Sequence, residues 1–342
     1  MKGRNIMCIR KTCYLSTLLS LCFPAVLFGQ QPRDASHAPE KIIIDTDIGS
    51  DIDDAFAVAL AIRSPELEIL GIATDSGDTN ERAKILDRML AEVGRPGIPV
   101  AVGVSSPPNP HNREWDSVIQ GRYGDNSRFP PKTHPNAVDF ILDQIRHYPG
   151  QITLVAIGPI PNIGAMIDKS PDTFRQIKRV VMMGGSINPI KPDFGNAPPL
   201  QQQREYNIYG DTVSSQKLFR SGVPIVLVPL DSTLHLTLDE TKRAAIFTQS
   251  TPLTDALTLL YQLWGQRTPD LIDPMTIGYI VDPTLCPVRP MRIRVDDSGY
   301  TRVESGAPNA QVCLHSDADT FIHFYLNRIL SPQSSPQLAS RQ

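Results

Sequence analysis

The distribution of apolar and polar positions along the 342-residue chain predicts strands that alternate with helices. Short apolar runs, typical of buried strands, lie at 42–44, 67–73, 98–102, 152–157, 180–183 and 225–228. Apolar residues at helical spacing lie between them, at 55–61, 79–90, 136–148, 160–169 and 211–219. This alternation predicts a single α/β domain with a mainly parallel central sheet flanked by helices.

The last third of the chain departs from this regular alternation. We expect helices over 244–265, after Pro274 and over 317–330, a β-hairpin over 291–303 and a last strand near Val312. The hairpin is predicted because the turn sequence Asp297-Ser298-Gly299 lies between two runs of alternating apolar and polar residues.

The turn between the first strand and the first helix is rich in acids. Asp45, Asp47, Asp51, Asp53 and Asp54 fall within ten positions. In an open α/β sheet such a turn lies at the carboxyl end of a strand, where ligand sites form. Charges of one sign repel, and a hard cation such as Ca²⁺ or Mg²⁺ would compensate them. Helix capping explains only Asp53 and Asp54, so the cluster predicts a metal or catalytic site.

Two later acids are placed in the same way. Asp78 follows the second strand, and Asp273 precedes an apolar helix. We expect both to converge with Asp47 and Asp54 at one rim of the sheet. A divalent ion there would lower the pKa of a water molecule while a carboxylate removes its proton, or it would chelate the diol of a sugar.

The helix that follows Asp78 is expected to begin with a capping residue. Thr79 is suited to cap it, with Glu81 and Arg82 facing water.

A long polar stretch, 103–135, contains six prolines. A loop of this length inside a compact domain is unusual. It is either a lid that excludes water or an irregular surface excursion, and both interpretations stay open.

Other metal and phosphate motifs fit poorly. An EF-hand that starts at Asp47 would need Glu where Val58 stands, and a phosphatase-like Asp45-x-Asp47 motif would want Thr at Gly49. There is no thiol or histidine cluster for structural zinc and no Walker-type glycine loop.

Composition narrows the class of protein. Apolar residues make up 41% and charged residues 20%, as in an ordinary globular domain. The formal net charge is −3, and no basic run follows residue 11, so no nucleic-acid partner is expected.

The amino terminus has the pattern of a secretory signal peptide. A basic start (Lys2, Arg4, Arg10, Lys11) precedes the apolar run 14–28, which is short for a membrane-spanning helix. We therefore expect cleavage near Gly29, no stable membrane anchor, and an exported protein, periplasmic or secreted.

The remaining domain limits follow from this assignment. Residues 1–29 are the expected signal peptide, 30–40 a flexible leader, 41–330 the folded domain and 331–342 a disordered tail. The domain retains two cysteines, Cys286 and Cys313, which either form a disulfide in an oxidising compartment or stay as buried thiols.

The segment IIIDTDIGSDIDDAFAVALA resembles the DxDxGxDDAxA signature of the nucleoside hydrolase family, inosine-uridine-preferring type, with two residues inserted near Asp51-Ile52. Weaker motifs follow in family order: ITLVAIGPIPNI (152–163), VVMMGG (180–185), REYNIYGD (204–211) and LIDP (271–274). The resemblance covers about 41–330.

The resemblance implies a Rossmann-like fold that binds one Ca²⁺ at the strand ends. Asp47 would be metal ligand and general base, and Asp54 a bidentate ligand. The Ile157 carbonyl and Asp273 would complete the set of metal ligands.

The resemblance also implies a set of residues that bind the sugar. Asp53 would bind the ribose 2′-hydroxyl, Glu205 and Asn207 the ribose hydroxyls, and Asn196 the 5′-hydroxyl. The insertion leaves open whether Asp51 or Asp53 contacts ribose.

The implied reaction is hydrolysis of the N-glycosidic bond of ribonucleosides or related N-ribosides, giving free base and ribose. Metal-bound water, deprotonated by Asp47, would attack the anomeric carbon through an oxocarbenium-like transition state. The partner would be a small-molecule nucleoside, and family members are commonly dimers or tetramers.

Two positions depart from the family pattern. Asp78 stands where the family has asparagine, and is a candidate sugar-binding or metal-binding group. Ile272 stands where inosine-uridine enzymes have a histidine that protonates the leaving group, and isoleucine has no proton to donate. His235, His111 and Tyr261 are candidate substitutes, each with the alternative of an ordinary surface or packing residue.

Three other functions compete with this one. The same scaffold would serve a non-catalytic calcium- and sugar-binding protein, or a hydrolase of a different glycoside. A metal-dependent phosphohydrolase would need cationic phosphate clamps, which the rim lacks.

Overall fold

The computed structural model describes residues 38–105, 117–126, 128–130, 132–189, 201–265 and 267–331. The expected signal peptide and most of the expected leader and tail lie outside these ranges, so those domain limits stay predictions. The first strand begins at Glu40, one residue before the expected domain. No helix in the described part of the chain is both long and apolar enough to cross a bilayer.

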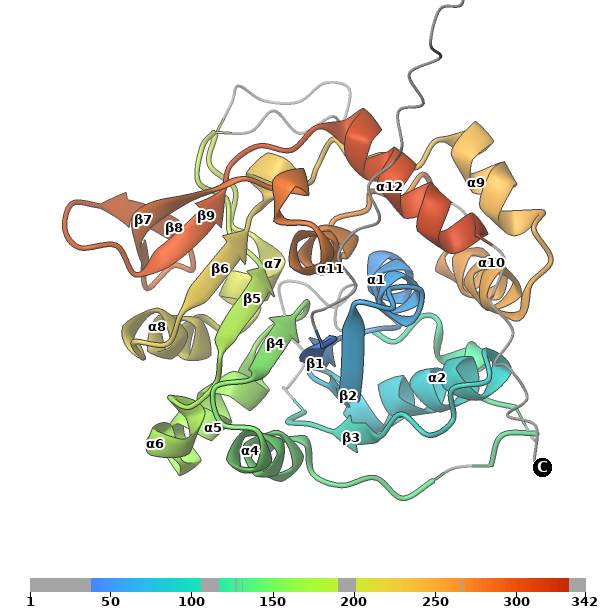
Figure 1. The fold of residues 1–342 in the computed structure, drawn as a ribbon, viewed down its shortest axis with the longest axis horizontal. Coiled ribbons are helices and arrows are strands. Elements are labelled where there is room, and N and C mark those ends of the chain that lie inside the picture. Colours follow the sequence, from blue (N-terminus) through green and yellow to red (C-terminus); the bar gives the residue numbers. More distant parts are fainter. Residues whose placement is uncertain are drawn as a thin grey trace, which may run out of the picture. The chain divides into compact units, whose positions relative to one another are not determined.

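The strands form one nine-stranded sheet in the order β3-β2-β1-β4-β5-β6-β9-β7-β8 (Figure 1). They are β1 (Glu40–Thr46), β2 (Leu67–Thr74), β3 (Val100–Val102), β4 (Ile152–Ala156), β5 (Arg179–Met183), β6 (Ile225–Val228), β7 (Val288–Val295), β8 (Thr301–Glu304) and β9 (Ala310–Cys313). All pairings from β3 to β9 along this order are parallel. The predicted Rossmann-like α/β fold is confirmed.

The strand order reverses between β1 and β4, which are neighbours in the sheet. Strands β2 and β3 follow β1 toward one edge, whereas β5 and β6 follow β4 toward the other. A parallel sheet with this reversal has a topological switch point, and ligands bind outside the carboxyl ends of the strands there. The acidic turn therefore follows the strand at which the binding site of such a fold is expected.

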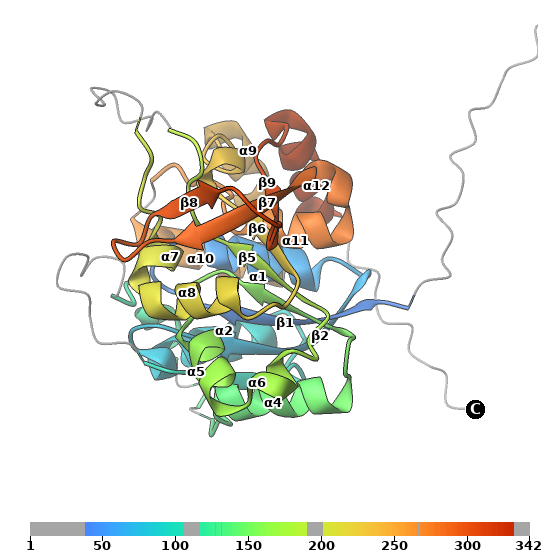
Figure 2. The ribbon, with the colours of Figure 1, turned by 90° about the vertical axis from the view of Figure 1, so that its left-hand side faces the viewer.

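The predicted hairpin is confirmed, with Val295 paired to Thr301 across its turn. It is also part of the main sheet, because β7 pairs antiparallel with β9. Figure 2 is viewed from the side of this hairpin, and β7 and β8 lie toward the viewer.

The helices are α1 (Asp53–Ile62), α2 (Thr79–Glu92), α4 (Ala137–His147), α5 (Pro161–Lys169), α6 (Pro171–Phe174), α7 (Tyr206–Gly210), α8 (Thr212–Arg220), α9 (Glu240–Phe247), α10 (Pro252–Trp264), α11 (Pro274–Val281) and α12 (Ala318–Leu330). The described residues also form the 3-10 turns η1 (Gly121–Tyr123), η2 (Leu230–Ser232) and η3 (Pro283–Leu285).

Helices cover both faces of the sheet (Figure 1). Helices α4, α5, α6 and α8 lie on one side, and α1, α2 and α9 to α12 on the other. Within β1, Ile43 belongs to the core under the first set and Ile42 and Ile44 to the core under the second. This alternation follows from the two-residue period of a strand, and all three side chains are fully buried because both faces are covered.

The expectation that 244–265 is largely helical is confirmed, and the structure divides this region into the two helices α9 and α10. Ser250 has a positive φ of 53°, and Thr251 and Thr254 form a capping box at the start of α10. Pro252 is the first residue of α10, where its missing N–H costs nothing. The short helix α7 was not predicted.

The expected exposure of Arg82 is also wrong. Asp78, rather than Thr79, caps α2 by accepting a hydrogen bond from the Glu81 amide at 3.0 Å. Arg82 is fully buried, because it lies on the face of α2 that also carries Leu86 and Met89.

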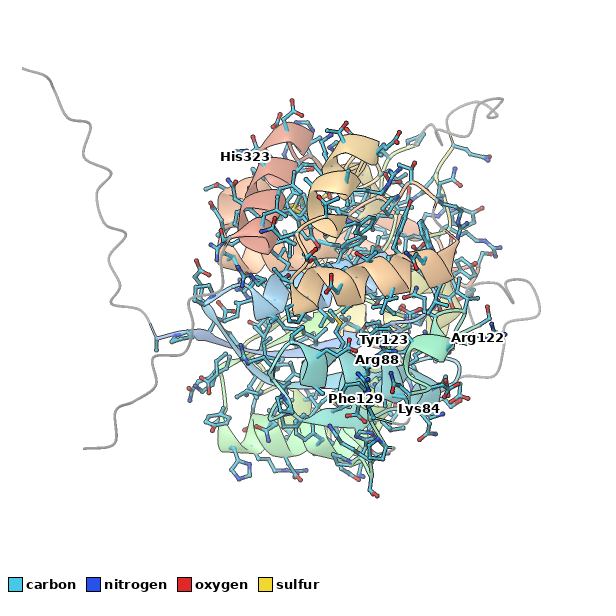
Figure 3. All side chains as sticks on the ribbon, turned by 90° about the vertical axis from the view of Figure 1, so that its right-hand side faces the viewer. Lys84, Arg88, Arg122, Tyr123, Phe129 and His323 are labelled. Carbon is cyan, nitrogen blue, oxygen red and sulfur yellow. A yellow bond between two sulfur atoms is a disulfide. The ribbon has the colours of Figure 1, made fainter. Side chains whose placement is uncertain are left out.

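Part of the long loop packs against α2. The Tyr123 ring is buried beneath the Arg88 guanidinium, 4.1 Å from the ring centroid, and its hydroxyl donates to Glu92 at 2.5 Å. Figure 3 shows Arg88 close to Tyr123 and Phe129. Whether the loop also closes over ligand stays a prediction, since 106–116 lie outside the described residues.

Cys286 and Cys313 form a disulfide, with their Cα atoms 5.6 Å apart. The sequence left open whether these cysteines form a disulfide or stay as buried thiols, and the structure has the disulfide. It joins the segment after η3 to the end of β9.

Candidate active site

Three carboxylates meet where α1 and α11 begin. Asp53, Asp54 and Asp273 each place an oxygen within 4.8 Å of the others, and all three side chains are buried. Asp53 and Asp54 form the first turn of α1, and Asp273 immediately precedes α11. The backbone N–H of Asp273 donates to Asp53 Oδ2 at 3.3 Å, which ties the two helix starts together.

Asp47 lies next to this group, just after β1. It is buried and lies outside the three-oxygen set, but its charge raises the pKa of Asp53, Asp54 and Asp273. Thr46 supports the arrangement from the end of the strand, because its hydroxyl donates to Asp54 Oδ1.

The electrostatics of the cluster call for a cation. Burial is the first cause that raises the pKa of Asp53, Asp54 and Asp273 well above the ordinary aspartate value, and repulsion among the acids adds to it. Near neutral pH these groups must hold protons or share a positive ion. Oxygen ligands at the carboxyl edge of the sheet fit a hard divalent metal.

Glu205 and Asn207 lie at the ends of neighbouring strands. Glu205 caps α7 and accepts hydrogen bonds from the backbone N–H groups of Gly185 (2.8 Å), Asn207 (2.8 Å) and Ile208 (3.1 Å). Burial nevertheless raises its pKa to about 7, and the charge of Asp47 contributes. That electrostatic effect shows that Glu205 lies near the acid cluster.

The Asn207 amide donates to the carbonyl oxygens of Ile157 and Met183, at 3.3 Å each. Ile157 directly follows β4, and Met183 is the last residue of β5. Asn207 therefore links the carboxyl ends of these two strands, of which β4 is the neighbour of β1. The structure thus places Asn207 in contact with both Glu205 and the Ile157 carbonyl, and the roles predicted for these residues stay predictions.

The other two predicted sugar-binding residues are not placed in this way. Asp78 is exposed and caps α2, and its predicted contact with a sugar stays a prediction. Asn196 lies outside the described residues. Asp51 is half-buried, and its backbone carbonyl accepts from the Gln120 side chain at 2.6 Å.

The described candidates for a leaving-group acid have partners outside the cluster. Ile272 packs against the apolar core. His235 hydrogen-bonds Ser316 near the start of α12, and Tyr261 packs on Phe247 and Trp264. His111 lies outside the described residues.

Sequence reasoning included Asp45 in the acidic cluster but missed its buried neighbour Asp75. Burial raises the pKa of Asp45 to about 7 and that of Asp75 well above its ordinary value, and the charge of Asp45 adds to the second shift. Asn162 donates to Asp45 Oδ1 at 2.7 Å. A Cβ at Gly158 would lie 2.6 Å from Asp75 Oδ1, so only glycine fits there. The position of Asp75, directly after β2, was the available signal.

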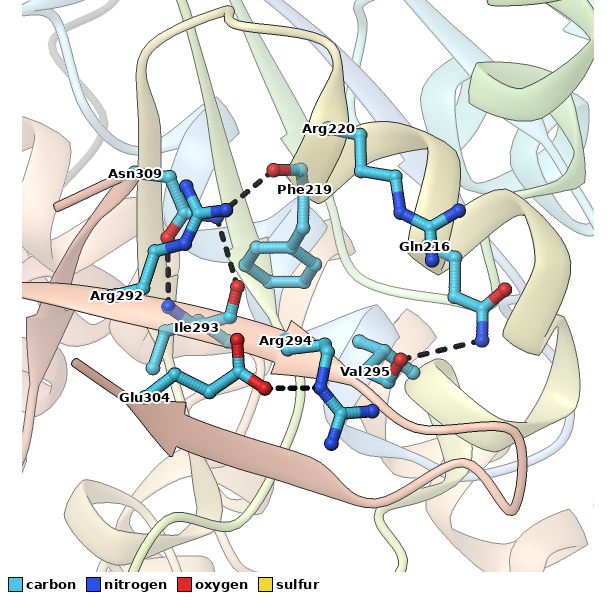
Figure 4. A pocket seen from close by; sticks show the side chains of 9 residues that line it. All are labelled: Gln216, Phe219, Arg220, Arg292, Ile293, Arg294, Val295, Glu304 and Asn309. Atoms are coloured by element: carbon cyan, nitrogen blue, oxygen red, sulfur yellow. Dashed lines mark hydrogen bonds and ion pairs between the residues drawn. The ribbon is translucent and has the colours of Figure 1, made fainter. Parts of the chain in front are cut away.

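A surface hollow between α8 and the β7–β8 hairpin contains none of these acids (Figure 4). It is lined by Gln216, Phe219, Arg220, Arg292, Ile293, Arg294, Val295, Glu304 and Asn309.

Fold and site define a class: a Rossmann-like α/β protein with buried carboxylates suited to a divalent metal at the switch point of its sheet. Over residues 42–323 the chain matches the family described as inosine-uridine preferring nucleoside hydrolase, and it belongs to that family. It is thus a ribonucleoside hydrolase, and its substrate is a small-molecule nucleoside.

Relatives differ in the bases that their names state. Uridine nucleosidase 1 of Arabidopsis thaliana is 30% identical over 286 residues, which cover 79% of this chain and 82% of that protein. The pyrimidine-specific ribonucleoside hydrolase RihA of Citrobacter koseri is 30% identical over 314 residues, which cover 84% of this chain and 97% of that protein. The structure of a purine-preferring ribonucleoside hydrolase from Gardnerella vaginalis has a TM-score of 0.73 at 26% identity. The match covers 85% of this chain and 98% of that one.

Proposed function

We propose that this protein hydrolyses the N-glycosidic bond of ribonucleosides, or of related N-ribosides, in a calcium-dependent reaction that yields free base and ribose. The observation that carries the proposal is the convergence of buried Asp53, Asp54 and Asp273 beside Asp47. Membership of the nucleoside hydrolase family supports the reaction class.

The metal would be held by the carboxylates of Asp47, Asp54 and Asp273 and by the Ile157 carbonyl. All four groups are oxygen donors, which Ca²⁺ prefers. When bound, the ion supplies positive charge that lowers the pKa of a water molecule and polarises sugar hydroxyls.

The protein's own groups would carry the remaining chemistry. Asp47 accepts a proton from the attacking water, whose oxygen bonds to the anomeric carbon as the bond to the base nitrogen breaks. The electron pair of that bond leaves with the base, which gains a proton from solvent while Asp47 returns its proton to solvent. Nearby carboxylates stabilise the positive charge that develops on the sugar.

Ribose would be oriented by Asp53, Glu205 and Asn207, with Asp78 and Asn196 as further proposed contacts. Glu205 has both carboxylate oxygens engaged by backbone N–H groups, so its side chain is held in one orientation. A fixed acceptor of this kind suits a ribose hydroxyl.

The test is ribose release from a panel of purine and pyrimidine ribonucleosides, with and without chelator. We expect release that chelator abolishes and calcium restores, and that Asp47→Ala loses. The panel also ranks the bases, on which the named relatives differ. A folded, calcium-binding protein that releases no sugar from any nucleoside contradicts the proposal.

Ile272 bears on the leaving group, and on the alternatives of a calcium- and sugar-binding protein or a hydrolase of a different glycoside. An isoleucine at this position has no proton for the departing base. Nucleosides with poor leaving groups test this point. Ribose binding without base release would support the binding protein.

We also propose export and self-association. The basic and apolar start of the chain and the disulfide between Cys286 and Cys313 support a periplasmic or secreted protein. Mass spectrometry of the native protein should find an amino terminus near Gln30. Light scattering of the purified protein should find a dimer or tetramer.

A further inference from the structure

Arg82 places a full positive charge in the interior, directly beneath the acidic turn. It is fully buried, and no described carboxylate forms an ion pair with it. Its Nη2 atom also has no hydrogen-bond partner among the described residues. Burial of an unpaired guanidinium is costly, so the contacts that it does make must offset a large penalty.

Those contacts join two loops of the active site. Arg82 Nη1 donates to the carbonyl oxygens of Asp47 and Ile48 and, at 2.9 Å, to the hydroxyl of Ser50. Arg82 Nε donates to the carbonyl oxygen of Ser76 at 2.9 Å. One planar side chain therefore ties the loop after β1 to the loop after β2.

The loop after β1 needs such support because its backbone is irregular. Gly49 has a φ of 109°, a left-handed conformation that favours glycine. Gln120 completes the support, since its backbone N–H donates to Gly49 O at 3.0 Å and its side chain to Asp51 O at 2.6 Å. Arg82 and Gln120 together thus bind the backbone carbonyls of residues 47, 48, 49 and 51.

The loop after β2 is strained at the residue that Arg82 holds. Ser76 has a positive φ of 57°, which is uncommon for a residue with a side chain. Such a conformation persists when surrounding contacts impose it.

We infer that Arg82 is a positioning residue that holds the acidic loop 47–51, and with it Asp47 and Asp54, in the geometry that binds calcium and orients the general base. The inference rests on the proposed function for the identity of the metal and the role of Asp47. It assigns Arg82 no contact with substrate.

The test compares Arg82→Met, Arg82→Lys and Ser50→Ala with the wild-type full-length protein. Methionine removes the donors, lysine keeps the charge without the planar fork, and Ser50→Ala removes one acceptor only. Arg63→Met is the matched control, because Arg63 also donates to backbone carbonyls of a distant segment, those of Arg328 and Ser331, at the other end of α1.

Calcium chloride is titrated calorimetrically into each chelator-treated protein, and kcat and KM are then measured at saturating calcium. Circular dichroism checks the fold. For Arg82→Met we expect calcium affinity to fall about 10- to 100-fold, as for other groups that orient metal ligands. We expect kcat to fall about 100-fold with a smaller change in KM, because misplacement of the base affects the reaction more than binding.

Arg82→Lys should show most of this loss, Ser50→Ala a smaller loss and Arg63→Met none. Unchanged calcium affinity and kcat in Arg82→Met overturn the inference. Tighter calcium binding also overturns it, because Arg82 would then act only as a competing charge. If Arg82→Met does not fold, Arg82→Lys and Ser50→Ala decide in the same way.

Failure of the proposed function gives a different result. If the wild type binds calcium but releases no base, the calorimetric comparison alone decides the role of Arg82. If the wild type hydrolyses nucleosides without binding calcium, the metal assignment fails and the kcat comparison decides.

Discussion

At the scale of single residues, buried carboxyl groups dominate this site. Asp47, Asp53, Asp54 and Asp273 lie in the interior. The charge of Asp47 raises the pKa of each of the other three carboxyl groups. Without a cation, protons must neutralise part of this charge. The ionisation of the site therefore depends on both pH and metal.

The first prediction at this scale concerns Asp47. Replacement by asparagine keeps the shape of the side chain and removes its basicity, so kcat should fall about 10²- to 10⁴-fold, the usual contribution of a general base. Ribose release measures the change. Asp172→Asn, an exposed residue paired with Arg175, is the control and should keep wild-type activity. Wild-type kcat in Asp47→Asn would assign the base elsewhere.

The second prediction concerns Glu205, whose pKa is raised by burial to about 7 from an ordinary 4.5. Between these values the unfolded chain is ionised at Glu205 while the folded chain keeps the proton. The unfolded state therefore binds fewer protons, and the free energy of unfolding falls as pH rises through this window.

In metal-free Glu205→Gln this contribution is absent, so the fall in unfolding free energy between about pH 5 and 7 should be smaller by about 1–3 kcal/mol. Urea unfolding at several pH values in chelator measures it. Glu304→Gln, on the exposed hairpin, is the control. An unchanged slope in Glu205→Gln would mean that Glu205 is ionised in the folded protein throughout.

At the scale of elements, the site depends on two helix starts that are distant in the chain. Helix α1 supplies Asp53 and Asp54, and the residue before α11 supplies Asp273. The disulfide between Cys286 and Cys313 lies shortly after α11 and links that part of the chain to β9. The disulfide thus restrains the part of the chain that carries Asp273.

Removal of this disulfide should destabilise the fold. The bond closes a loop with a sequence separation of 27. A loop of that length corresponds to about 3.5 kcal/mol of unfolding free energy in the chain-entropy description. Urea unfolding of Cys286→Ala/Cys313→Ala should show a loss of this order, and reduction of the wild type a similar one. Equal stability of oxidised and reduced protein would show that the bond restrains little.

At the scale of the whole molecule, metal binding and folding are linked. The acids whose pKa is raised in the folded state ionise at a higher pH there than in the unfolded chain. The metal-free fold therefore loses stability as pH rises above the ordinary aspartate pKa. A cation binds the ionised acids and stabilises the fold by its affinity and concentration.

We therefore expect chelation to lower Tm, and the gap between calcium-loaded and metal-free protein to widen from pH 5 to pH 8, by about 5 °C or more at the upper end. Differential scanning fluorimetry measures both curves. Asp54→Asn should shrink the gap, because it removes a proposed ligand. A gap that is independent of pH and unchanged in Asp54→Asn would place the stabilising ion elsewhere.

Much of the fold was predictable because it depends on local patterns. The apolar runs from Ile42 to Val228 matched β1 to β6, since a strand covered on both faces must be apolar throughout. The break between α9 and α10 was overlooked although Thr251-Pro252 is a local signal for a helix start. Helix α7 escaped because five residues are too few for a periodic pattern.

The chain by itself determined the kind of chemistry, because motif spacing places Asp47, Asp54 and Asp273 after a strand or before a helix, where a parallel sheet gathers its ligand groups. Only the tertiary structure decided which groups meet. It buried Arg82 beneath the acidic loop, paired Asp45 with Asp75, and left Asp78 at the surface as a cap. The reason is physical: local sequence sets the direction of a side chain, whereas burial and the field of other charges depend on residues that lie far away in the chain.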